Sequence, residues 1–94
     1  MVIDLDKVIE SIDWLDAERV LWVWSNETLG AHDPTIREGT EPGDFYKGLI
    51  LAAFRADPNN RDRLRLGFAS LIAAVEATQI IGPDPLRQIV RRHR

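Results

Sequence analysis

The sequence contains no cysteine. Disulfide bonds and thiolate metal sites are therefore excluded, and folding does not require an oxidising compartment. A long apolar segment is also absent, since no apolar run approaches the roughly 18 residues of a membrane span. The N-terminus carries acidic residues where a signal peptide has a basic start. We expect a cytoplasmic protein that neither enters a membrane nor is exported.

Patterns for catalysis and metal binding are missing as well. The sequence lacks a phosphate-binding loop, and no serine has a base nearby in the sequence. His32 and Asp33, with Glu38 and Glu41, could be drawn as a metal or acid–base cluster, but polar loops produce such groupings often by chance. We therefore expect a protein that is not an enzyme and uses neither a metal nor another cofactor.

The composition is that of an ordinary globular chain, and its charge is unevenly distributed. Ninety-four residues, of which 45% are hydrophobic and 29% charged, are expected to form one domain over residues 1–94. Residues 1–46 hold eleven acidic and three basic side chains, whereas residues 47–94 hold four and nine. This asymmetry indicates either an interaction face or an acidic half packed against a basic half, and we favour the second.

Helical periodicity dominates the first half of the sequence. Apolar residues between Leu5 and Leu15 recur at helical spacing and predict an amphipathic helix capped by Asp4. The period is interrupted near residues 13–16, and Asp16 is expected to start a second helix that stops at Gly30. Residues 31–43 contain two prolines and two glycines and predict a long connection.

A third helix is expected after this connection. Thr40 is its predicted cap, and Pro42 occupies the first turn, where proline is tolerated. Its apolar face predicts that it is the most buried helix after the one that carries the tryptophans.

Two Asp-Pro pairs predict the later helix starts. In Asp57-Pro58 and in Asp84-Pro85 the aspartate accepts a first-turn N–H while the proline needs no acceptor. Residues 58–81 form either one helix or two that break at Gly67-Phe68, and we favour the break. The prediction is an all-α fold, a compact single-domain bundle of five or six short helices.

The stretch RVLWVWSNE, residues 19–27, holds two of the three tryptophans. On a helix Trp22 and Trp24 diverge by about 200°, so they do not share a face. We expect Trp22 to be buried and Trp24 to lie nearer the surface, beside a polar rim of Ser25, Asn26 and Glu27. Because tryptophan and arginine dominate interface hot spots, the main functional prediction is a protein–protein interaction module that binds another protein.

An acidic stripe of Asp6, Glu10 and Asp13 suggests a sharper alternative. Small acidic helical proteins of phages and mobile elements often inhibit a host enzyme by covering its nucleic-acid-binding groove, and this chain is similar to them in size and charge alone. Its partner would then be a nucleic-acid-binding enzyme. The sequence is also compatible with a homodimer.

A helix-turn-helix-like DNA-binding protein is the second alternative. Arg61, Arg63 and Arg65 crowd the start of one helix and could contact phosphates. The helix that would read bases, FASLIAAVEATQ, offers little beyond Ser70, Thr78 and Gln79 and has the composition of a core helix. With a sequence pI of about 5.3, we do not expect direct binding of nucleic acid.

Overall fold

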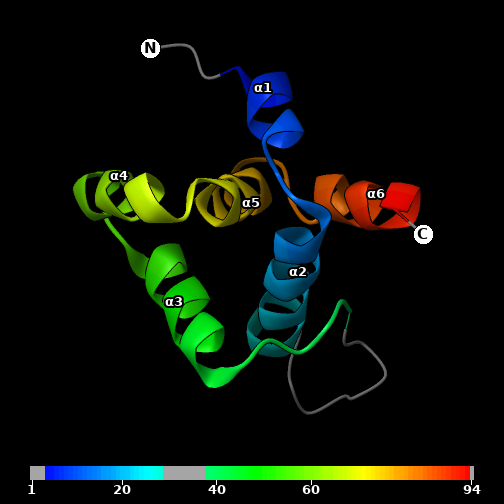
Figure 1. The fold of residues 1–94 in the computed structure, drawn as a ribbon, viewed down its shortest axis with the longest axis horizontal. Helices are drawn as coiled ribbons and strands as arrows, with labels where there is room; N and C mark the ends of the chain where they lie inside the picture. Colours follow the sequence, from blue (N-terminus) through cyan, green and yellow to red (C-terminus); the bar gives the residue numbers. More distant parts are fainter. Residues whose placement is uncertain (1–3, 29–37, 94) are drawn as a thin grey trace.

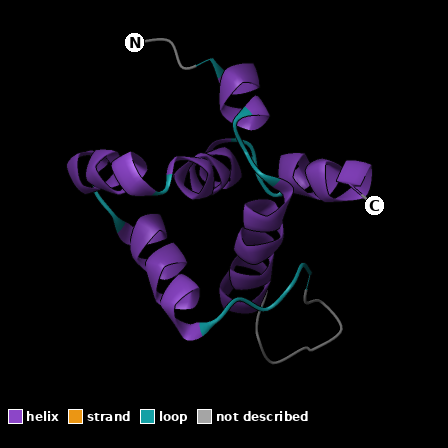
Figure 2. Cartoon of the chain, viewed as in Figure 1, coloured by secondary structure: helices purple, strands orange, loops and turns teal. Residues whose placement is uncertain are grey.

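The computed structural model describes residues 4–28 and 38–93, and every regular element within these ranges is a helix. Figure 2 shows helices and connecting loops throughout this part of the chain. The prediction of an all-α bundle with five or six short helices is confirmed. The helices are α1 (Leu5–Glu10), α2 (Trp14–Thr28), α3 (Asp44–Arg55), α4 (Pro58–Gly67), α5 (Ala69–Ile80) and α6 (Asp84–His93).

Helix α5 forms the centre of the bundle, and the other five helices all pack against it (Figure 1). This corrects the expectation that α3 would be the most buried helix after α2, since α3 buries only Ile50 and Ala53. The sequence of α5 has no continuous polar face, so the helix is buried around most of its circumference. Its buried residues are Leu71, Ile72, Ala73, Ala74, Val75, Ala77 and Thr78.

The described residues form a flattened globule of 38 × 27 × 19 Å. The Cα radius of gyration is 12.5 Å, close to the value of about 12 Å expected for a compact chain of this length. Among the described helices, none has both the length and the apolar character needed to cross a membrane.

Two of the three predicted aspartate caps are confirmed. The carboxylate of Asp4 accepts a hydrogen bond from the backbone N–H of Lys7 at 3.3 Å, and Asp57 accepts one from the N–H of Asn60 at 2.7 Å. Asp84 is not a cap, because it is itself the first residue of α6. Its carboxylate instead pairs with Arg87 at 2.7 Å, one turn along the helix.

The predicted break between the first two helices is present but lies earlier in the chain. Helix α1 ends at Glu10 and α2 begins at Trp14, so Asp16 falls inside the first turn of α2. The backbone N–H of Asp13 donates to the hydroxyl of Ser70 at 2.7 Å, which fixes the junction to α5. This contact between residues distant in sequence explains why local capping rules misplaced the boundary.

Helix α3 also begins at a different residue from the one predicted. Its N-cap is Gly43, so Thr40 does not cap the helix and Pro42 precedes its first turn. The hydroxyl of Thr40 donates to the carboxylate of Glu18 on α2 at 2.8 Å. A tertiary hydrogen bond therefore takes the place of the expected local one.

Residues 58–81 contain two helices, as favoured from the sequence. Helix α4 ends at Gly67, and Phe68 leaves the helical conformation with φ −136° and ψ 51°. Helix α5 then starts at Ala69. The break turns α4 out of line with α5, so that α4 packs on α5 and forms a cleft with α3.

Candidate protein-binding surface

All three indoles on α2 are half-buried. The expectation that Trp22 is a fully buried core residue is therefore wrong, although its ring does pack against the core. The inner face of α2 is filled by the smaller side chains of Ala17, Val20, Leu21 and Val23. Because α5 packs closely against this inner face of α2, only aliphatic side chains fit between the two helices. The large indoles lie at the edges of the α2–α5 contact instead.

Trp24 lies beneath a cation from α6. The guanidinium carbon of Arg87 is 5.6 Å from the centroid of the indole ring, within the range of a cation–π contact. Arg87 donates to both carboxylate oxygens of Glu38, with Nε 3.0 Å from each, and to Asp84 at 2.7 Å. We refer to Trp24, Glu38, Asp84 and Arg87 as the Trp24 surface.

The charges of the Trp24 surface hold the guanidinium in place. The hydrogen bond to Glu38 is the largest influence that raises the pKa of Arg87 above its ordinary value, burial acts in the opposite direction, and Asp84 adds to the rise. These contacts therefore favour the charged form of Arg87, which arginine keeps in proteins in any case. The side chains of Arg87 and Glu38 keep 29% and 35% of their area exposed, so the surface is preorganised and still accessible.

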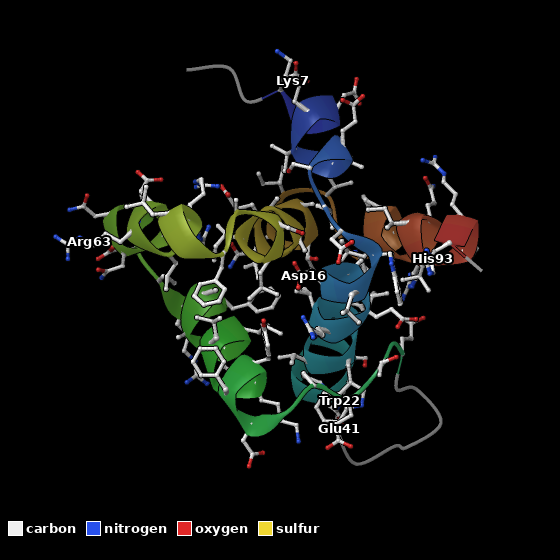
Figure 3. The ribbon with its side chains drawn as sticks, viewed as in Figure 1. Lys7, Asp16, Trp22, Glu41, Arg63 and His93 are labelled. Atoms are coloured by element: carbon white, nitrogen blue, oxygen red, sulfur yellow. The ribbon has the colours of Figure 1, made fainter. Side chains whose placement is uncertain are left out.

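Trp22 and Trp14 make separate contacts of a similar kind. The ammonium of Lys47 lies 5.0 Å from the Trp22 ring centroid and pairs with Glu41 at 2.7 Å. The ring of Trp14 stacks on His93 with centroids 3.7 Å apart and planes inclined by 10°. Figure 3 shows Trp22 and Glu41 at the same end of α2. These contacts attach α3 and α6 to α2.

The segment after residue 37 runs along α2 and brings Glu38 to Arg87. The N–H of Glu38 donates to the hydroxyl of Ser25 at 3.0 Å. At Gly39 the backbone has φ +81°, and a Cβ there would lie 2.1 Å from the carbonyl oxygen of Glu18. Only glycine permits this close approach.

The polar rim predicted beside Trp24 is not present in that form. Asn26 is only 6% exposed, and its amide donates to the carbonyl of Trp22 at 2.9 Å. Ser25 is 1% exposed. The side chain of Glu27 lies outside the described residues. The polar groups around Trp24 come instead from α6 and from Glu38, which sequence proximity to Trp24 did not indicate.

The acidic stripe is exposed. Asp6 and Glu10 lie on α1 and Asp13 follows it, and none of the three belongs to an ion pair among the described residues. Ion pairs between the acidic and basic halves involve Glu38 and Glu41. Internal neutralisation, which we favoured, therefore reaches the segment before α3 but not the stripe.

A basic cleft between α3 and α4 was not anticipated from the sequence. It has a volume of about 420 Å³ and is lined by Ala52, Arg55, Ala56, Asn60, Arg63 and Leu64. Arg61, Arg63 and Arg65 were considered above as DNA contacts, and of these three only Arg63 lines the cleft. Arg61 donates to the carbonyls of Ala53 and Ala56, and Arg65 pairs with Glu76 and Asp62.

The helix considered for base reading is engaged within the protein. The hydroxyl of Ser70 accepts from Asp13, Thr78 donates to the carbonyl of Ala74, and Gln79 donates to the carbonyl of Phe54. Since five helices pack around α5, it cannot enter a DNA groove without unfolding of the bundle.

The cluster considered for a metal is only partly described. His32 and Asp33 lie outside the described residues, whereas Glu38 and Glu41 are engaged with Arg87 and Lys47. Across residues 4–28 and 38–93, no group of three or more potential ligands could hold a metal ion.

Comparison with known proteins adds no family to this description. No family model matches the chain, and no similar curated protein or solved structure was found.

Proposed function

We propose that the chain is a non-catalytic protein-binding module and that the Trp24 surface contacts the partner. The observation that carries the proposal is the half-buried indole of Trp24 beneath the guanidinium of Arg87. Tryptophan and arginine are among the side chains most enriched in interface hot spots. Here both types meet at one accessible place.

The fixed position of Arg87 supports the proposal energetically. Binding normally costs about 0.5–1.5 kcal/mol for each flexible side chain that becomes immobilised. Arg87 is already held by Glu38 and Asp84, so a partner that uses it avoids much of this cost. The exposed carboxylate of Asp84, with 75% of its side-chain area accessible, adds a polar margin.

The test is capture of the partner by the tagged protein from an extract of its native host. We expect Trp24→Ala to reduce the captured partner at least about tenfold, as loss of a hot spot does. Trp22→Ala is the matched control, because it removes the same indole from a different side of α2. Far-ultraviolet circular dichroism on each variant verifies that the fold is retained.

Equal capture by the folded Trp24→Ala variant and the unaltered chain would exclude the Trp24 surface. If neither the unaltered chain nor either variant captured a protein, even after chemical cross-linking, the result would count against protein binding as the function.

An acidic inhibitor of a nucleic-acid-binding enzyme is the second candidate. It is favoured by the exposure of Asp6, Glu10 and Asp13 without ion pairs among the described residues. Its partner complex would weaken steeply with salt, because exposed charges are screened beyond about 10 Å at 0.1 M. Loss of capture with Asp6→Asn/Glu10→Gln, but not with Trp24→Ala, would distinguish this function from the first.

A further inference from the structure

The basic cleft is lined by apolar and by cationic side chains, together with Asn60. Ala52, Ala56 and Leu64 supply the apolar lining, while Arg55 comes from the end of α3 and Arg63 from α4. Figure 3 shows Arg63 at the outer edge of α4, away from the centre of the bundle. Such a cleft fits a segment that carries carboxylates together with a small apolar surface.

The two arginines that line the cleft differ from their neighbours in having no acceptor among the described residues. Arg61 is held by the carbonyls of Ala53 and Ala56, and Arg65 by Glu76 and Asp62. Arg55 and Arg63 are exposed and enter no ion pair within this part of the chain. The nearby carboxylate of Asp57 is occupied as the cap of α4.

Helix α1 has the complementary chemistry. Residues 4–13 contain four carboxylates and one lysine. Asp6 and Glu10 are one turn apart and therefore share a face of α1, about 6 Å from each other at Cβ. Both are exposed, and the half-buried Ile9 lies next to Glu10.

A chain cannot place its own α1 in its own cleft. Helix α1 packs chiefly on α5 and projects on one side of the α4–α5 pair, whereas α3 lies on the other side (Figure 1). The cleft and the acidic helix therefore complement each other only between molecules.

We propose that the cleft between α3 and α4 binds α1 of a second copy of this chain, with Asp6 and Glu10 of that copy pairing with Arg55 and Arg63. The two surfaces are different, so the contact is head-to-tail and does not close into a twofold dimer. Exposed ion pairs contribute at most about 1 kcal/mol each, and the association is weak and salt-sensitive. The proposal is independent of the Trp24 surface, since it uses neither α2 nor α6.

The first experiment is sedimentation velocity at protein concentrations up to about 1 mM, which detects affinities at the weak end of the scale. At about 0.01 M salt, where the screening length is about 30 Å, we expect the mean mass to rise beyond a dimer as concentration increases. At about 1 M salt, with a screening length of about 3 Å, the chain is monomeric. A monomer at low salt, or association unaffected by salt, would overturn the proposal.

The second experiment separates the two surfaces. Asp6→Asn/Glu10→Gln removes the charge of α1, and Arg55→Gln/Arg63→Gln removes that of the cleft. Each variant alone is expected to be monomeric at low salt. Mixed together they form a 1:1 dimer and nothing larger, because only one acidic helix and one basic cleft remain per pair.

The matched control is Arg91→Gln/Arg92→Gln, which removes two exposed arginines of α6 and leaves both surfaces intact. We expect this variant to associate as the unaltered chain does. Association that persists in the cleft variant alone, or a mixture that stays monomeric, would contradict the assigned contact.

Discussion

At the scale of single residues, Gly39 has the least room for a side chain among the described glycines. A Cβ there would lie 2.1 Å from the carbonyl oxygen of Glu18, and φ is +81°. We expect Gly39→Ala to lower the free energy of unfolding by about 1–3 kcal/mol, because inserting a methyl group into filled space typically costs this much. Urea denaturation measures the change.

Gly48 supplies the control for this substitution. It lies in α3, is exposed, and has no neighbouring atom within 4 Å of the place that an added methyl group would occupy. Gly48→Ala should stabilise the protein by up to about 1 kcal/mol through helix propensity. If Gly39→Ala and Gly48→Ala changed the free energy of unfolding equally, the close approach at Gly39 would not contribute to stability.

The tryptophans allow a second prediction at this scale. Trp22 packs against the core, while the described contact of Trp24 is with the cation of Arg87. Because both indoles are half-buried, we expect Trp22→Ala to cost about 2–3 kcal/mol, below the roughly 3–5 of a fully buried tryptophan, and Trp24→Ala to cost less than about 2. Chemical denaturation of the two variants provides the comparison. A larger loss at Trp24 would show that the Trp24 surface is chiefly a packing contact.

At the scale of elements, Arg61 connects the end of α3 to α4. One of its terminal nitrogens donates to the carbonyls of Ala53 and Ala56 at 3.1 and 3.4 Å. Its Nε is buried and has no acceptor in the described part of the chain. The cost of burying this nitrogen offsets part of the stability that the two hydrogen bonds provide. We expect Arg61→Ala to destabilise by about 1–2 kcal/mol, whereas Arg63→Ala, an exposed substitution, stays within about 0.5. Thermal melting of both variants distinguishes an arginine that caps a helix from one that is free to bind a ligand.

The positions of the helices were largely predictable from the sequence, and their burial was less so. Caps at Asp4 and Asp57 and the break at Gly67 depend on neighbouring residues, so local rules located them. The start of α3 was misplaced because Thr40 bonds to Glu18, 22 positions away. The Trp24 surface was predictable only in part, since the sequence singled out Trp24 but could not bring Arg87 and Glu38 to it.

At the scale of the whole molecule, the central position of α5 predicts an uneven distribution of stability. Amides of α5 are covered by five helices, whereas α1 has six residues, none of them buried, and packs chiefly on one neighbour. Hydrogen exchange should therefore be slowest in α5, near the global free energy of unfolding, and fastest in α1. Mass spectrometry of exchanged peptides resolves the two segments. Equal protection would mean that the bundle opens only as a unit.

The same central position has a consequence while the chain is being made. Helices α1, α2 and α3 leave the ribosome before α5, yet each of them uses α5 to cover its apolar face. At about 5–20 residues per second, the interval between completion of α3 and of α5 lasts a few seconds. During that time α2 and α3 can pack only on each other, and their apolar side chains that face α5 have no native partner to cover them. Native packing of the first three helices therefore cannot begin around α5 until residues 69–80 are made, and α2 is covered fully only once α6 follows. Until then the growing chain is open to chaperone binding.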